Sequence, residues 1–212
     1  MASALGGYAS TIDAPFAHGP LEPRRGVKYA LVTPVGDELR LRALVRRSRH
    51  SPCYDADACA YCQQGADHRA PDWDCGCGFY AVADDTQLRE VMGAYRQPHW
   101  ARLEVELFGR VIEHERGWRA SRQVTLSAAW PNVCRRCSGP ASGFTRGDTV
   151  DGPALSPCCP ACGGGGFLPI VQVIEQLGIE VRLTPPAPGE LVPTERLRPG
   201  RAPRWQGWAG RA

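Results

Sequence analysis

The residues of this chain best suited to chemistry are its cysteines. There are ten of them, and they fall into two groups. The second group contains two Cys-x-x-Cys pairs, Cys134/Cys137 and Cys159/Cys162, joined by a longer loop. Each pair offers two thiolates from a tight knuckle, and a loop of this length can bring two knuckles together. The spacing predicts a tetrahedral zinc site with four cysteine ligands, with Cys158 as an alternate ligand because it adjoins Cys159.

The first group is less regular and spans residues 53–77. Its candidate ligands are Cys53, Cys59, Cys62, His68, Cys75 and Cys77. The favoured set is Cys59, Cys62, Cys75 and Cys77, which again gives two pairs of thiolates. In the alternative set His68 replaces Cys59 and makes a site of three cysteines and one histidine, and Cys53 is either spare or a substitute for Cys59. The sequence therefore predicts a second zinc ion, and both ions are expected to be structural.

The second group also resembles a known unit. The chain reads Cys-Arg-Arg-Cys-Ser-Gly from Cys134 and Cys-Pro-Ala-Cys-Gly-Gly-Gly-Gly from Cys159. Residues 134–168 thus resemble the DnaJ-type zinc finger, whose unit is Cys-x-x-Cys-x-Gly-x-Gly. The chaperone family has four such units and this chain has two, so the resemblance implies one zinc site. It implies no co-chaperone activity, because the His-Pro-Asp signature is missing.

A second resemblance covers residues 65–125. It is carried by the stretch from Cys75 to Ala81 and by the stretch from Val105 to Ala120. These stretches resemble a pattern found in uncharacterised bacterial and phage proteins. The resemblance implies a reused scaffold and no particular activity.

Composition favours metal ligands over disulfides. No basic start followed by an apolar segment marks a signal peptide, and no apolar run is long enough to span a bilayer. A cytoplasmic location is expected, where cysteines persist as thiolates rather than disulfides. The net charge of +3 does not identify a partner. Lys28 is the only lysine, and an arginine excess is also typical of a GC-rich genome.

Apolar periodicity predicts an α+β fold. The expected strands are 27–32, 39–45, 79–82, 103–112, 118–126 and 179–183, and the expected helices are 85–95 and 170–177. The first two strands and the pair 103–112/118–126 are expected to form hairpins. Gly178 is expected to end the second helix. Together these elements predict a small curved antiparallel sheet or partial barrel, with two short helices and zinc knuckles in its loops.

The expected organisation is one domain with two loose ends. Residues 1–25 form an N-terminal arm without periodicity. Residues 26–183 form the zinc-stabilised domain, which carries the first site in 53–77 and a zinc-ribbon insert in 134–166. Residues 184–212 form a disordered tail of Arg, Trp and Pro.

Catalytic functions find little support. A zinc nucleobase deaminase needs His-x-Glu and Pro-Cys-x-x-Cys, but His114 is followed directly by Glu115 and the second motif is missing. Two sites with four cysteines each leave no coordination position for a catalytic water. The stretch Glu113–Arg119 is interpreted as the charged end of a hairpin. The chain is predicted not to be an enzyme, with a thiol redox enzyme as a remote alternative.

Arginine and tryptophan point to nucleic acid. Arg46, Arg47 and Arg49 follow the first hairpin, and the tail contains Arg204, Trp205 and Trp208. Arginine contacts phosphate, and indole stacks on the bases of single strands. The sequence thus predicts a non-enzymatic zinc protein that binds nucleic acid. The alternative is a zinc-stabilised adaptor or regulatory protein of bacterial or phage origin that binds another protein. No membrane partner is expected, and no small-molecule substrate is identified.

Overall fold

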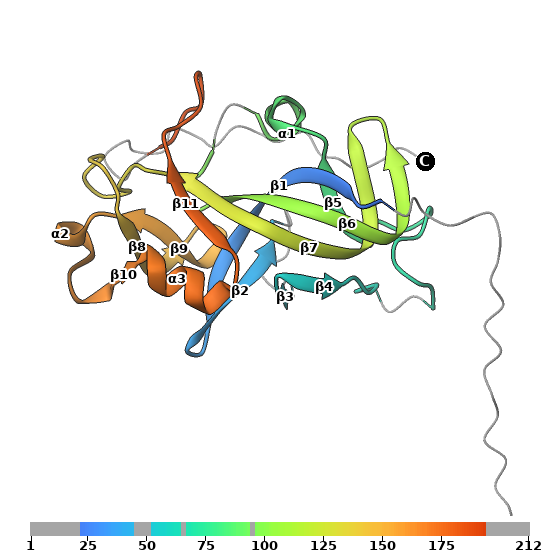
Figure 1. Cartoon of the computed structure of the whole chain (residues 1–212), viewed down its shortest axis with the longest axis horizontal. Helices are drawn as coiled ribbons and strands as arrows, with labels where there is room; N and C mark the ends of the chain where they lie inside the picture. The colour runs from blue at the N-terminus through green and yellow to red at the C-terminus, as the bar shows by residue number, and fades with distance from the viewer. Residues whose placement is uncertain (1–21, 45–51, 65–66, 94–95, 194–212) are drawn as a thin grey trace, which may run out of the picture.

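The computed structural model describes residues 22–44, 52–64, 67–93 and 96–193 (Figure 1). In these ranges the chain forms an eight-stranded, mostly antiparallel sheet, a three-stranded sheet and three short α-helices. The large sheet is curved, and its described strands end in two edges, β11 and β3, rather than closing into a barrel. The predicted α+β class with cysteine clusters in the loops is confirmed. The sequence did not predict the small sheet or the third helix.

The large sheet has the strand order β11-β7-β5-β1-β2-β3, with β4 paired to β7 and β6 paired to both β1 and β7. Its strands are β1 (Arg24–Val35), β2 (Glu38–Ala43), β3 (Cys53–Tyr54), β4 (Asp57–Cys59), β5 (Phe79–Val82), β6 (Ala101–His114), β7 (Gly117–Pro131) and β11 (Glu180–Thr184). The small sheet contains β8 (Gly143–Thr149), β9 (Gly152–Cys158) and β10 (Phe167–Pro169). The helices are α1 (Asp85–Met92), α2 (Pro160–Gly163), the 3-10 turn η1 (Gly164–Gly166) and α3 (Ile170–Leu177).

Both predicted hairpins are present. The β1–β2 and β6–β7 pairs are antiparallel, because a tight turn can join only neighbouring strands that run in opposite directions. On β6, Leu103 and Val105 are fully buried, while the intervening Glu104 lies on the other face. Two register shifts, at Glu104/Val105 and at Phe108/Val111, add the local bends that curve the sheet.

The two predicted helices are also present, and their ends have clear causes. The side chain of Asp84 caps α1 by accepting hydrogen bonds from the backbone amides of Thr86 and Gln87 at 2.8 and 2.9 Å. This helix ends at Met92, short of the predicted residue 95. Gly178 ends α3 in the left-handed conformation with φ of 65°, which a residue without a Cβ adopts at little cost.

The main core joins the two sheets. Trp130 of β7 and Phe144 of β8 are fully buried and pack edge to face with their ring centroids 4.8 Å apart. Val173 of α3 is buried in the same cluster. The small sheet therefore shares its apolar interior with the large one, so loss of packing in one is expected to weaken the other.

Both terminal segments that the sequence predicts to be loose are shorter in the structure. β1 begins at Arg24, so the last residues of the predicted arm belong to a strand. Beyond β11, Glu190 forms an ion pair with Arg96 at 3.3 Å, with both side chains almost fully buried. Residues 185–193 therefore lie against the domain rather than in the predicted tail. Residues 1–21 and 194–212 lie outside the described ranges.

A polar cluster interrupts the apolar interior of the large sheet. Although Lys28 is only partly buried as a whole, its ammonium lies 5.7 and 5.4 Å from the ring centroids of Tyr54 and Phe79. The ammonium donates a hydrogen bond to the Gln123 side chain at 3.0 Å, and Gln123 donates to Thr125 at 3.1 Å. Burial lowers the pKa of Lys28 to about 8, because the apolar surroundings disfavour the charged form.

The lowered pKa of Lys28 predicts stability that rises with pH. Between about pH 8 and 10 the unfolded chain keeps the lysine proton while the folded chain releases it, so the free energy of unfolding increases with pH. We expect a rise of about 2 kcal/mol over this range. Urea unfolding of the metal-loaded protein from pH 7 to 10 measures it. Lys28→Met should lack this component, and parallel pH profiles of the two proteins would contradict the assignment.

Candidate metal centres

The second cysteine group forms one compact cluster just beyond the end of β7. The sulfur atoms of Cys134, Cys137, Cys159 and Cys162 all lie within 4.8 Å of one another. Those of Cys137 and Cys159 are 3.8 Å apart. The structure thus brings together the four residues that the Cys-x-x-Cys spacing predicts, and it leaves Cys158 outside the group.

Each Cys-x-x-Cys pair is shaped by a tight backbone turn. The amide of Ser138 donates to the carbonyl of Cys134 at 2.9 Å, and the amide of Gly163 donates to the carbonyl of Cys159 at 3.0 Å. Ser138 has φ of 64°, and Gly164 has φ of 52°. The first turn thus places a serine in the left-handed region, at a cost that glycine would avoid.

The β8–β9 hairpin brings the two pairs together. Its register runs from Thr149↔Gly152 at the turn to Gly143↔Cys158 at the open end. The chain therefore leaves the first pair and returns to the same place, where Cys158 is the last residue of β9 and Cys159 begins the second pair. The loop expected between the pairs is for the most part this hairpin.

The local electrostatics favour a thiolate at Cys134. Burial acts to raise the pKa of this thiol, but hydrogen bonds from the backbone of Cys137, Cys159 and Arg136 lower it to about 6. Cys158 shows the opposite behaviour, because burial and then the neighbouring Cys134 raise its pKa to about 11. The Cys158 thiol donates to the carbonyl of Cys159 at 3.3 Å. The Cys158 thiol is thus bonded to a backbone carbonyl and lies outside the group of four, whereas Cys134 belongs to that group.

The first group also forms a four-residue cluster. Ligand atoms of Cys62, His68, Cys75 and Cys77 all lie within 4.8 Å of one another. The imidazole Nε2 of His68 is 3.3 Å from the sulfur of Cys77, and the sulfurs of Cys62 and Cys75 are 3.7 Å apart. This is the set of three cysteines and one histidine that the sequence offered as the alternative.

The favoured set with Cys59 is not the one that the structure assembles. Cys59 is exposed and is the last residue of β4, where it pairs with Arg122 of β7. The next amide, that of Ala60, continues the ladder to the carbonyl of Ser121 at 2.7 Å. Strand pairing therefore holds Cys59 outside the cluster. Cys53 lies in β3 opposite Arg42 and is likewise not part of it.

Neighbouring side chains support the first cluster. The guanidinium of Arg119 donates to the carbonyl of Cys75 and lies over the ring of Tyr80, 5.5 Å from its centroid. The Tyr80 hydroxyl donates to the carbonyl of Gly76 at 3.1 Å. A Cβ on Gly78, which has φ of 111°, would lie 2.8 Å from the Arg119 side chain. Glycine at this position therefore lets Arg119 reach the ligand loop.

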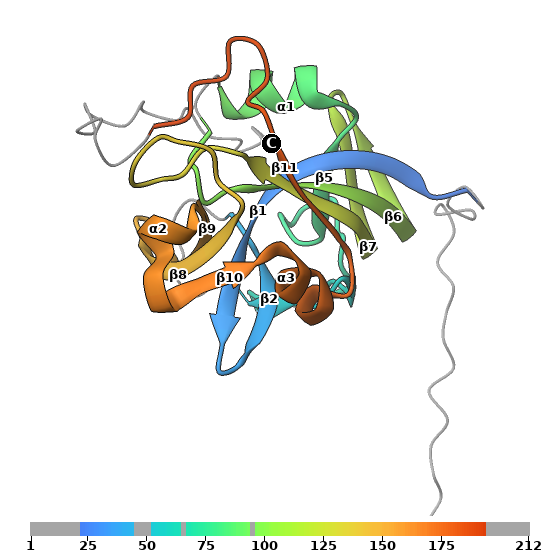
Figure 2. The same ribbon diagram turned by 60° about the vertical axis from the view of Figure 1, so that its left-hand side comes forward.

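The two clusters lie at opposite ends of β7. Residues 60–78 connect β4 and β5, which pair with β7 between Gly117 and Val124, whereas the second cluster follows Pro131. Figures 1 and 2 both show α2, β8 and β10 gathered at one end of the fold. Each cluster supplies four ligand atoms from protein side chains. The geometry is compatible with two metal ions, each with its coordination positions filled.

The stretch Glu113–Arg119 is the end of a hairpin, as interpreted from the sequence. Glu113 is exposed and lies 3.7 Å from Arg24. His114 packs between aromatic rings, 6.4 Å from Trp73 and 6.5 Å from Tyr80 between centroids. Burial, followed by the charge of Arg119, lowers the pKa of His114. These contacts describe a packed imidazole at the rim of the first cluster.

The proposed nucleic-acid contacts Arg46, Arg47, Arg49, Arg204, Trp205 and Trp208 lie outside the described residues. The two arginines of β2, Arg40 and Arg42, precede them in the chain and are described. Arg40 contacts Glu38 and Asp55 at 3.1 and 3.6 Å. Arg42 is buried and donates to the carbonyl of Asp151 at 2.6 Å. Both arginines of β2 are therefore engaged in contacts within the domain.

Comparison with known proteins finds no matching family model, no matching curated protein and no matching solved structure. Among the described residues, no helix combines the length and the apolar character needed to cross a bilayer. The metal clusters are thus the features of this chain from which a function can be argued.

Proposed function

We propose that both clusters hold structural Zn²⁺ ions in a non-enzymatic protein of the reducing cytoplasm. The separation of the ligand atoms carries the proposal. In a tetrahedral site with zinc–sulfur bonds of about 2.3 Å, sulfur atoms lie about 3.8 Å apart. The separations of 3.7 Å between Cys62 and Cys75 and 3.8 Å between Cys137 and Cys159 match this value. The second cluster is then a pair of DnaJ-type knuckles.

The ligand types support zinc over harder cations. Three or four thiolates, with at most one imidazole, suit zinc, whereas calcium and magnesium prefer oxygen. Four protein ligands also leave no position for a metal-bound water, which argues for a structural role. Native mass spectrometry of the purified protein should find two zinc ions, and their removal by a strong chelator should unfold it. A metal-free protein that stays folded would refute the proposal.

For the role of the folded domain, we propose binding of nucleic acid, with single strands as the first candidate. The support comes from the sequence, which places Arg46, Arg47 and Arg49 directly after the first hairpin and interleaves arginine with Trp205 and Trp208 near the C-terminus. Arginine neutralises phosphates, and indole rings stack on unpaired bases. A preformed zinc-stabilised domain would hold these two segments on one scaffold.

Fluorescence anisotropy with labelled single-stranded DNA and RNA tests this role. The chain should be truncated after Pro193, because the buried Glu190–Arg96 ion pair makes residues up to 193 part of the domain. Truncation combined with Arg46, Arg47 and Arg49→Ala should weaken binding by at least about tenfold and flatten its salt dependence. The control Arg116→Ala removes a cation from the β6–β7 turn instead. Unchanged affinity in the combined variant would show that these segments do not make the contacts, and absence of saturable binding by the full-length protein would remove nucleic acid from consideration.

A protein partner is the second candidate, and the surface of the first cluster favours it. Tyr61, next to Cys62, and Trp73, two residues before Cys75, are 63% and 61% exposed, and aromatic side chains are enriched at protein interfaces. Asp67, Asp72 and Asp74 lie in the same loop, and such charges repel phosphate. A stoichiometric complex that resists nuclease and salt, and that Trp73→Ala abolishes, would favour this role.

A further inference from the structure

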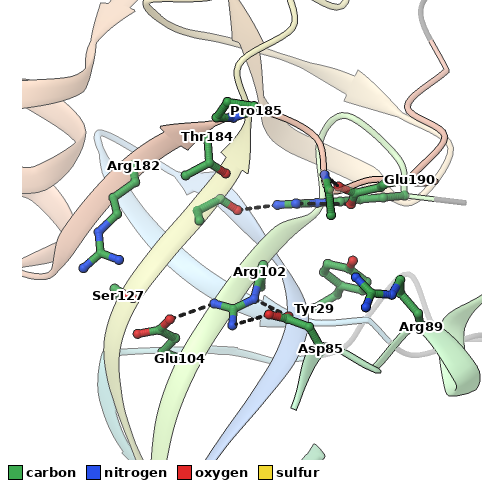
Figure 3. Close-up of a pocket in the computed structure, with 13 residues that line it drawn as sticks. Tyr29, Asp85, Arg89, Arg102, Glu104, Ser127, Arg182, Thr184, Pro185 and Glu190 are labelled. Atoms are coloured by element: carbon green, nitrogen blue, oxygen red, sulfur yellow. Dashed lines mark hydrogen bonds and ion pairs between the residues drawn. The ribbon is translucent and has the colours of Figure 1, made fainter. Parts of the chain in front are cut away.

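A pocket of about 290 Å³ lies between α1 and the large sheet (Figure 3). Its floor is formed by β1, β6, β7 and β11. Its sides are formed by α1 and by residues 184–190. Four arginines and three carboxylates line it, far more charge than a sheet face covered by a helix and a loop normally holds.

The three carboxylates are all matched by arginines of the same pocket. Arg102 donates to both carboxylate oxygens of Asp85, at 2.5 and 2.9 Å, and to Glu104 at 2.9 Å. Glu190 pairs with Arg96 at 3.3 Å. The pairing with Arg102 also lowers the pKa of Glu104. The three carboxylates are therefore already engaged, and they fix Arg102 and Arg96 in place.

Two hydrogen-bond donors of the pocket have no partner among the described residues. Arg89 extends from the last turn of α1, and its guanidinium makes no ion pair or hydrogen bond with the described part of the chain. The hydroxyl of Tyr29 likewise has no hydrogen-bond partner within the described ranges, although its ring packs against Trp100 and the Arg96 guanidinium. The remaining pocket arginine, Arg182, pairs with Glu180 outside the pocket. Arg102 carries one positive charge against the two negative charges of Asp85 and Glu104, so the lining as a whole is close to neutral. Arg89 is nevertheless the pocket guanidinium that pairs with no carboxylate of the described residues.

We propose that this pocket binds a small anionic ligand, whose carboxylate or phosphate oxygens are received by the Arg89 guanidinium and the Tyr29 hydroxyl. Arginine binds both groups with two parallel hydrogen bonds. The volume is at the lower end of the range for ligand pockets, which is about 300–1,000 Å³, so the ligand has the size of a small metabolite. None of the lining residues belongs to either metal cluster.

Amide chemical shifts of the metal-loaded, full-length protein test the proposal, with inorganic phosphate and succinate as separate probes. We expect saturable shifts at residues 29, 85–89 and 182–187 with at least one probe, in the millimolar range. Arg89→Gln should weaken binding about tenfold, the effect of one charge-assisted hydrogen bond. Tyr29→Phe keeps the ring contacts and should weaken it about threefold.

The matched control is Arg116→Gln in the β6–β7 turn. Arg116 is also partly exposed and makes no ion pair within the described ranges, so this variant removes the same charge far from the pocket. Its affinity for the probe should equal that of the unaltered protein. The proposal is overturned if neither probe gives saturable shifts at the pocket, or if Arg89→Gln and Arg116→Gln have equal effects. Two bound metal ions in every variant would show that the fold is retained.

Discussion

Replacing Cys137 by serine is expected to lower the bound zinc from two ions to one and to unfold the small sheet. The hydroxyl is a poor zinc ligand, and the remaining three thiols would then be crowded together without their cation. Binding of structural zinc contributes about 10–16 kcal/mol to folding in small zinc-finger peptides. We therefore expect a loss on the order of 5 kcal/mol or more, which lowers the melting temperature by roughly 10–20 °C.

The effect should spread beyond the cluster for a structural reason. The second cluster closes the open end of the β8–β9 hairpin, and Phe144 of β8 packs on Trp130 in the shared core. Hydrogen exchange should accelerate first at the amides of β8 and β9, while those of the β1–β2 hairpin remain protected for longer. Native mass spectrometry and thermal unfolding measure the two parts of the prediction.

Cys158→Ala is the matched control for Cys137→Ser. Cys158 is fully buried beside the cluster but does not belong to it, so the variant should keep both zinc ions and lose about 1 kcal/mol through the small cavity it creates. Loss of an ion in Cys158→Ala, together with two ions in Cys137→Ser, would mean that the ligand set is assigned wrongly.

The features that the sequence predicted well are those encoded by local patterns. The alternation of apolar and polar residues in 103–112 and 118–126 defines a hairpin within one stretch of chain, and Gly178 marks a helix end by itself. The Cys134/Cys137 and Cys159/Cys162 pairs are equally local, because each knuckle is a single turn of backbone. Such signals do not depend on the rest of the fold.

The features that it did not predict depend on distant contacts. Residues 143–158 contain several Gly and Pro residues and no clear alternation, yet they form paired strands that bury Phe144 and Leu155 in the shared core. β11 pairs parallel to β7, which neither strand's own pattern indicates. Residues 185–193 have the composition of a tail, yet the distant Arg96 recruits Glu190 into a buried ion pair. The pocket beside Arg89 follows from this same packing.

The ligand set of the first cluster also depends on a distant contact, the pairing of β4 with β7, and it gives the second prediction. His68→Ala should abolish zinc binding at this site, whereas Cys59→Ala should leave it intact. Sequence spacing alone favours Cys59 because Cys-x-x-Cys is the commoner pattern, but pairing of β4 with β7 holds Cys59 on the strand, and the imidazole of His68 lies 3.3 Å from Cys77 instead. Loss of a direct ligand should cost more than the roughly 10–100-fold in affinity that loss of a supporting hydrogen bond costs.

Competition with a chromophoric zinc chelator measures the affinity of this site in each variant, with the zinc count by native mass spectrometry beside it. His68→Cys is the informative companion, because a thiolate at the same position converts the cluster to four cysteines and should retain the ion. The reverse pattern, in which Cys59→Ala releases one zinc and His68→Ala keeps both, would restore the set that the spacing favours. It would also require residues 57–60 to leave their ladder with β7, since that ladder pairs Cys59 with Arg122 and keeps it out of the group that the other three ligands form.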